Sequence, residues 1–63
     1  MAPHQERVVT EKSELDMKIA KLTPFLDNEM FKTLPTDEQS RLSRQLSIMQ
    51  NYSQVLGERI AAF

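Results

Sequence analysis

The sequence predicts an all-α fold: a helical hairpin of two long helices joined by an apolar elbow, which assembles into a homo-oligomer. Apolar residues recur at helical spacing on both sides of the middle of the chain. One glycine and three prolines are the only strong interruptions. A chain of 63 residues buries only about 60% of the surface that its unfolded state exposes, so a second copy is expected to help cover it. Residues 1–63 form a single helical-hairpin domain.

The first long helix is expected over about residues 4–26. Its apolar residues lie three, four or seven positions apart, a spacing that only a helix brings onto one face. They form a narrow stripe of about 80°, which His4 and Lys12 share. The residues of this stripe are Val8, Leu15, Ile19, Leu22 and Leu26. Pro24 lacks a backbone N–H, so the helix is expected to end there or to kink on its way to Leu26.

The elbow is expected at residues 27–35, where apolar side chains are dense, with room for one short helical turn after Asp27. The second long helix is expected over about residues 37–62. Thr36 is predicted to cap the N–H of Gln39 in a capping box, and acidic residues follow it in the first turn, where the helix dipole favours them.

The apolar face of the second helix is far wider, spreading over about 180°. One narrow helix cannot cover such a face, and an uncovered apolar face on a small protein indicates an interaction surface. The simplest complement is another copy of the chain. The oligomer interface is predicted at Leu42, Ile48, Met49, Val55, Leu56, Ile60 and Phe63. In the alternative, the elbow residues Phe25, Met30 and Phe31 fold back over the excess.

Four polar residues lie on one line within this apolar face, and they are the candidate ligand-binding residues: Arg41, Gln45, Tyr52 and Arg59. A guanidinium on an apolar face needs an anionic partner or a route to water. If two second helices pack antiparallel about a centre near Gln50, Arg41 of one chain approaches Arg59 of the other, and an anion between them is favoured.

With the tyrosine to stack on a ring and the glutamine to hydrogen-bond an edge, such a groove suits a phosphorylated, base-containing ligand. An acidic protein segment, or Glu11 and Glu14 of the first helix, could take the place of that anion. In the structural alternative, the arginine stems cover apolar surface and their charged heads reach solvent. Gly57 costs about 1 kcal/mol inside a helix, which hints at close packing or the approach of a ligand.

The sequence argues against several classes of function. It has no cysteine and a single histidine, His4 in the first helical turn, so no catalytic site is expected. No metal site and no cofactor are expected either, because carboxylates such as Glu11, Glu14 and Asp16 read as ion-pair partners of nearby lysines.

The distribution of charge and hydropathy excludes two kinds of partner. Residues 1–33 carry five basic and six acidic side chains, and residues 34–63 carry three of each. This balance predicts neither sequence-independent nucleic-acid binding nor membrane-surface binding, both of which need a basic excess. No apolar run is long enough to span a membrane and no signal-peptide pattern is present, so a cytoplasmic location is expected.

A pattern along nearly the whole chain resembles a group of short accessory proteins of tailed phages and prophages. Its residues are Arg7-Val8, Glu11-Lys12, Glu14-Leu15, Lys18-Ile19, Leu22, Phe31, Leu34, Glu38-Gln39, Leu42, Gln45-Leu46, Met49, Tyr52, Leu56 and Arg59-Ile60. Pro24 departs from the uninterrupted first helix of that group. The resemblance implies a phage accessory protein in the cytoplasm of the host cell.

At the level of architecture, the predicted oligomeric hairpin is similar to phage counter-defence sponges. These small helical proteins sequester cyclic nucleotides or related signals of immune systems such as CBASS and Thoeris. The function this implies is sequestration of a nucleotide immune signal in an oligomeric helical groove. Two alternatives are an inhibitor that docks its wide helical face on a host or defence protein, and a structural or regulatory phage accessory protein.

Overall fold

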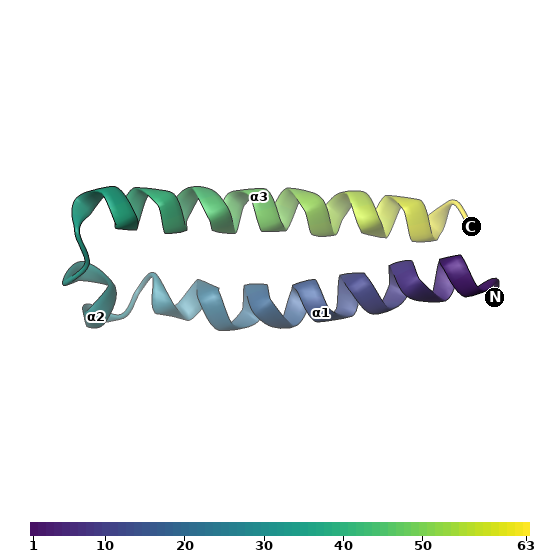
Figure 1. The fold of residues 1–63 in the computed structure, drawn as a ribbon, viewed down its shortest axis with the longest axis horizontal. Coiled ribbons are helices and arrows are strands. Elements are labelled where there is room, and N and C mark those ends of the chain that lie inside the picture. The colour runs from purple at the N-terminus through teal and green to yellow at the C-terminus, as the bar shows by residue number, and fades with distance from the viewer.

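The computed structural model describes all 63 residues as two long helices joined by a short one. The helices are α1 (Pro3–Phe25), α2 (Glu29–Lys32) and α3 (Thr36–Ala61). α1 and α3 lie side by side and antiparallel, so both termini are at the same end (Figure 1). The molecule is a rod of 45 × 15 × 13 Å. The predicted fold class, an all-α hairpin with a short helical turn in its elbow, is confirmed.

α1 is held at its start by proline and a side-chain contact. Pro3 takes the first helical position, where a missing N–H costs nothing because no carbonyl precedes it in the helix. The N–H of Ala2 donates to Oε1 of Gln5 at 2.9 Å. Pro24 lies in the last turn, and α1 ends one residue later at Phe25. Pro24 has no N–H to donate to the carbonyl of Ala20, but helical bonding continues past it, since the N–H of Leu26 donates to the carbonyl of Leu22 at 3.3 Å.

The elbow forms a small apolar cluster of its own at one end of the rod. The side chain of Asn28 caps α2 by accepting from the N–H of Met30 at 2.8 Å. The rings of Phe25 and Phe31 meet edge to face with centroids 6.0 Å apart. Met30 is exposed. The alternative in which these residues cover the wide face of the second helix is therefore wrong for its middle part, where Ile48 remains exposed.

The capping box predicted at Thr36 is wrong. Pro35 occupies the N-cap position with an extended backbone, which places Thr36 inside the first turn, and no side chain caps the helix. The Gln39 side chain turns outward from the helix instead and donates to the carbonyl of Leu34 at 2.8 Å and to that of Lys32 at 3.3 Å. Gln39 thereby fastens α3 to the elbow.

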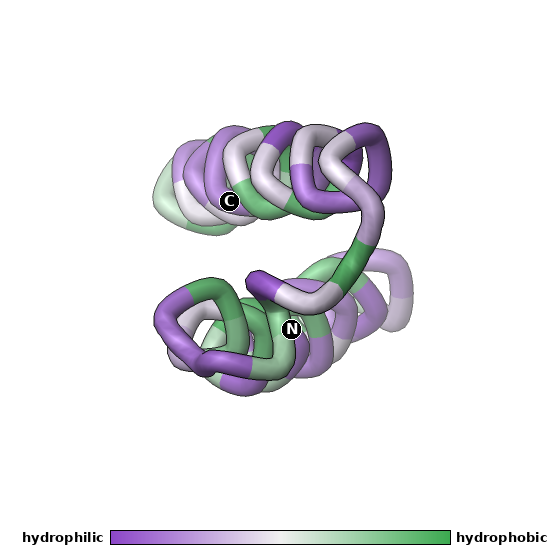
Figure 2. The backbone as a smooth tube through the Cα atoms, turned by 90° about the vertical axis from the view of Figure 1, so that its left-hand side faces the viewer, coloured by the Kyte–Doolittle hydropathy of each residue, from purple (hydrophilic) through white to green (hydrophobic).

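The core between α1 and α3 is thin. Only Val8, Ser53 and Leu56 are buried, and Leu56 is completely enclosed. Half-buried apolar side chains of both helices flank them, and the hydrophobic positions gather toward the facing sides of the two helices (Figure 2). Leu56, predicted at the oligomer interface, lies within the hairpin core instead, because α1 packs over that side of α3.

The rest of the wide apolar face of α3 stays open. Ile48 is 59% exposed and Val55 is 50% exposed, and Phe63 at the end of the chain is exposed as well. Leu42, Met49 and Ile60 are half-buried along the seam. Neither long helix carries an apolar stretch that could cross a membrane.

Candidate functional site

The four predicted ligand-binding residues follow one side of α3 but fall into two groups. All four are exposed. Arg41 and Gln45 lie near the elbow, whereas Tyr52 and Arg59 lie toward the open end of the hairpin. At 1.5 Å per helical residue, Gln45 and Arg59 are about 21 Å apart. One small ligand on a single chain therefore does not contact all four.

The group near the elbow lines a groove between the two long helices. This groove has a volume of about 470 Å³ and is lined by Lys18, Lys21, Leu22, Phe25, Gln45 and Met49. A second hollow of about 320 Å³ adjoins it on α3 and shares Gln45 and Met49. Its other lining residues are Arg41, Arg44 and Ile48. We call the two hollows together the basic groove.

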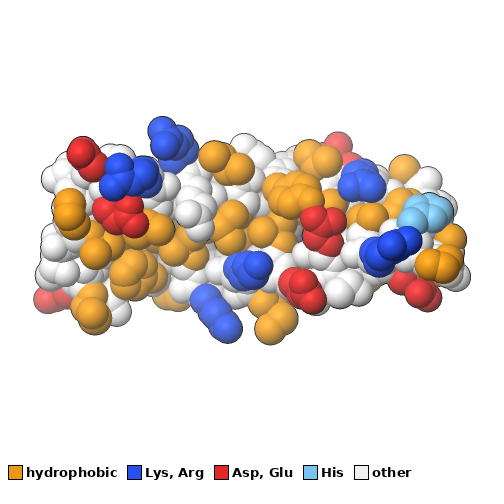
Figure 3. Space-filling model, viewed as in Figure 1, with side chains coloured by type: hydrophobic (Ala, Val, Ile, Leu, Met, Phe, Trp, Pro, Cys, Tyr) orange, Lys and Arg blue, Asp and Glu red, His pale blue; other side chains and the backbone are white.

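The chemistry of the basic groove is that of an anion site with an apolar floor. No acidic residue lines it. Figure 3 shows lysine and arginine side chains beside the hydrophobic seam between the helices. Of the four basic residues, only Arg41 has an acidic partner, since its Nε lies 2.8 Å from Oε1 of Glu38. Lys18, Lys21 and Arg44 make no ion pair within the chain, so their charges are available to a ligand.

The group toward the open end is partly occupied by the protein itself. The Tyr52 hydroxyl donates a hydrogen bond to Oε2 of Glu11 on α1. This bond raises the pKa of Tyr52, as do partial desolvation and the Glu11 charge, while the charge of Arg59 opposes them. Glu11 therefore contacts Tyr52, and it makes no ion pair with Arg41 or Arg59, between which the sequence offered it as the anion. Arg59 makes no ion pair within the chain.

A polar cluster that the sequence did not predict links the helices at mid-length. Lys12 Nζ donates to Ser53 Oγ at 2.8 Å and to Asp16 Oδ2 at 3.0 Å, and Ser53 donates to the other oxygen of Asp16. The hydrogen bonds from Ser53 and Lys12 lower the pKa of Asp16, against the effect of desolvation. The three side chains satisfy one another, so this cluster is structural.

Three positions in the sequence could have indicated this cluster. Lys12 falls on the apolar stripe of α1, and Ser53 falls among the apolar residues of α3. Gly57 lies one turn after Ser53, where a Cβ would be 3.4 Å from Cε of Lys12. A methyl group there would only touch the lysine stem, so the packing of Lys12 does not require glycine at position 57.

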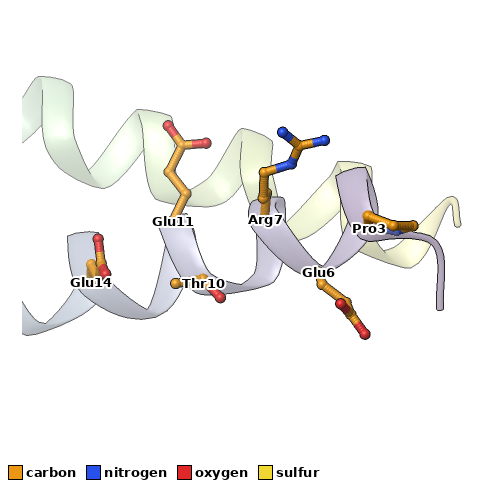
Figure 4. A pocket seen from close by; sticks show the side chains of 6 residues that line it. All are labelled: Pro3, Glu6, Arg7, Thr10, Glu11 and Glu14. Atoms are coloured by element: carbon orange, nitrogen blue, oxygen red, sulfur yellow. The ribbon is translucent and has the colours of Figure 1, made fainter.

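The side chains that line a polar hollow on α1 near the N-terminus do not point toward a common centre. It is lined by Pro3, Glu6, Arg7, Thr10, Glu11 and Glu14. Arg7 and Glu11 point to one side of the helix, whereas Glu6 points to the opposite side (Figure 4). No group of three or more histidine, aspartate or glutamate side chains is placed to hold a metal ion.

Comparisons with known proteins give one family and one relative. A family model described as Sequestin matches residues 2–62. A protein of Enterobacteria phage T4, described as an uncharacterized 7.5 kDa protein in the denB-rIIB intergenic region, is 38% identical over 63 residues. The match covers all of this chain and 98% of the T4 protein. No solved structure matches the chain. The T4 relative confirms the resemblance to short phage proteins.

Proposed function

This chain belongs to the Sequestin family, and we propose from that membership that it is a phage counter-defence protein that sequesters a nucleotide immune signal. The family name implies a protein that sequesters rather than one that catalyses. The T4 relative supports a role in phage infection.

The basic groove is the observation that carries the ligand class. Lys18, Lys21 and Arg44 offer unpaired positive charge to phosphate groups, and arginine can grip two phosphate oxygens at once. The floor of Leu22, Phe25 and Met49 offers an apolar surface to a base. A nucleotide has anionic phosphates and a flat, largely apolar base, and so it matches both the basic and the apolar residues of this lining.

Two of the four predicted ligand-binding residues line the basic groove, and the other two do not. Arg41 and Gln45 line the basic groove, and they keep their proposed role as ligand contacts. Tyr52 and Arg59 lie outside the groove of their own chain, so they can act on the same ligand only through a second copy.

A second candidate function is inhibition of a host or defence protein. The observation that favours it is the open apolar line of Ile48 and Val55 on α3, which could enter a groove of another protein. A structural or regulatory accessory role would need only self-assembly through the same line.

Heating the protein purified from phage-infected, defence-carrying cells tests these functions together. The sponge is expected to release an intact nucleotide, identified by mass spectrometry of the supernatant. A variant with Lys18→Gln and Lys21→Gln should release little, and the matched variant Lys32→Gln, changed on α2 outside the groove, should release as much as the unaltered protein. A co-purified polypeptide without nucleotide would support the inhibitor. Neither nucleotide nor polypeptide would contradict both.

A further inference from the structure

Gln45 differs in its chemistry from every other residue of the basic groove. It lines both hollows, and of the other lining residues only Met49 does the same. The charged residues of the lining are lysines and arginines, which can only donate hydrogen bonds. The remaining side chains are apolar, and the thioether of Met49 is a weak acceptor. The amide of Gln45 therefore provides the one strong side-chain acceptor in the groove.

The two ends of this amide differ in what they contact. Nε2 of Gln45 donates to Sδ of Met49 at 3.8 Å. The opposite orientation would turn the carbonyl oxygen toward the lone pairs of the sulfur, so this contact favours the observed one. Oε1 accepts no hydrogen bond from the chain, and Gln45 is exposed. The free end of the amide is thus an acceptor that a ligand in the groove can reach, and it calls for an N–H donor.

Phe25 gives the groove a fixed aromatic surface. It is the only aromatic residue of the lining, and it lies on α1, across the groove from Gln45 on α3. Its ring meets that of Phe31 edge to face, with the planes at 82°, which restrains its orientation. An aromatic ring stacks on any base, because every base has a π face. Phe25 can therefore attract a base without selecting one, and the selection falls to Gln45.

We propose that Gln45 determines which base the basic groove accepts, and that this base is adenine, stacked on Phe25 with its exocyclic amine donating to Oε1 of Gln45. Adenine presents that amine beside the ring nitrogen N7, on the edge that glutamine side chains read. Guanine presents two acceptors on the same edge, O6 and N7, and neither can donate to Oε1. This inference rests on the proposed function, because it takes the groove to be a nucleotide site.

The phosphates of such a nucleotide have partners of their own. Phe25 and Lys18 are seven residues apart, about 10 Å along α1. The base can therefore lie toward the elbow while the phosphates lie beside Lys18, which makes no ion pair within the chain. Lysine binds a phosphate whatever base is attached to it. Affinity for phosphate and preference for a base thus depend on different residues, which lets each be measured by itself.

Two probes that differ only in the amine test the role of Gln45. They are adenosine 5′-diphosphate (ADP) and purine riboside 5′-diphosphate, in which a hydrogen replaces the amine. Calorimetric titration of the unaltered protein should show about three- to tenfold tighter binding of ADP, the effect of one hydrogen bond. Gln45→Met keeps the length of the side chain but has no strong acceptor, so it should bind both probes equally. The matched variant Gln54→Met, exposed on α3 outside the groove, should keep the preference.

Gln45→Glu distinguishes the two ends of the amide. The carboxylate keeps an acceptor and loses the donor, so the preference for ADP should persist. Its negative charge should weaken the binding of both diphosphates. Circular dichroism checks that each variant keeps its helices. Loss of the preference in Gln45→Glu, or tighter binding of guanosine 5′-diphosphate than of ADP by the unaltered protein, would overturn the assignment.

The variant with Lys18→Gln and Lys21→Gln separates this inference from the proposed function. It should weaken the binding of both probes and leave their ratio unchanged, because it removes phosphate contacts only. Equal binding of the two probes by the unaltered protein, weakened by this variant, would overturn the role of Gln45 and leave the proposed function standing. Release of nucleotide on heating by a protein that binds neither probe would do the same. A protein that releases no nucleotide and binds neither probe would contradict the proposed function itself.

Discussion

Lys12 on α1 donates a hydrogen bond of 2.8 Å to Ser53 on α3, which is one of the three buried residues of the hairpin. Because Ser53 also donates to Asp16, one serine joins both charged groups to the second helix. We expect Ser53→Ala to lower the free energy of unfolding by about 1 kcal/mol, the usual effect of losing a hydrogen bond. Thermal unfolding followed by circular dichroism measures it. An unchanged melting temperature would show that the cluster adds nothing to stability.

Acid should weaken the same cluster. The pKa of Asp16 is lowered in the folded protein, so the carboxylate contributes stability above its unfolded pKa of 3.8. That contribution is lost as the pH falls through 3.8 and then through the lower folded value. Asp16→Asn should therefore reduce stability at neutral pH and flatten its decline in acid. If the stability of Asp16→Asn falls in acid as steeply as that of the unaltered protein, other carboxylates cause the loss of stability.

Gly57→Ala is expected to stabilise the protein. Alanine is favoured over glycine within a helix by about 1 kcal/mol. The added Cβ would lie 3.4 Å from Cε of Lys12, an ordinary contact with a flexible side chain. Denaturant unfolding should therefore show a higher midpoint with an unchanged slope. A lower midpoint would mean that the Lys12 stem cannot adjust.

Tyr52 should titrate at a higher pH than free tyrosine. Its hydrogen bond to Glu11 raises the pKa above 10.0, so this bond stabilises the fold below pH 10.0 and its effect is lost as the pH rises through the folded pKa. Tyr52 is the only tyrosine and the chain has no tryptophan, so phenolate absorbance reports it alone. Glu11→Gln should lower its pKa toward 10.0, whereas Arg59→Gln should raise it. No shift in Glu11→Gln would contradict the contact.

The arginines should differ in their effect on ligand binding. Where a second copy brings its Arg59 to the groove, Arg59→Met is expected to weaken binding of the released nucleotide by roughly tenfold to a hundredfold, the effect of a lost charge-assisted hydrogen bond. Arg41→Met should cost less, because Glu38 already shares its charge. Calorimetric titration of both variants measures the difference, with melting temperature as control. If both variants keep their affinity and are equally or more stable, the two arginines do not bind the ligand, and their aliphatic stems only cover apolar surface.

The sequence predicted the architecture well because periodicity and proline act locally. The stripe of α1, the elbow and the wide face of α3 follow from spacing alone. The start of α3 was misjudged because Pro35 supplies the N-cap backbone, which leaves the hydroxyl of Thr36 without a capping role. Spacing could not show which part of the wide face α1 covers, and so Leu56 was placed on the outside.

The candidate site was predicted only in part. Arg41 and Gln45 were found because they share the α3 face that lines the groove. Lys18 and Lys21 were assigned to ion pairs, because helical spacing puts acidic residues near them, and only the fold shows that they border Gln45. Contacts between helices depend on their relative rotation, which no pattern within one helix reveals.

The native mass of the protein purified from phage-infected, defence-carrying cells tests the central claim most directly. Mass spectrometry under native conditions counts chains and bound molecules together. The account predicts more than one chain of 7.3 kDa together with nucleotide, and the loss of that nucleotide, but not of the additional chains, in the variant with Lys18→Gln and Lys21→Gln. A bare single chain from the same cells would contradict both the sequestration and the predicted homo-oligomer.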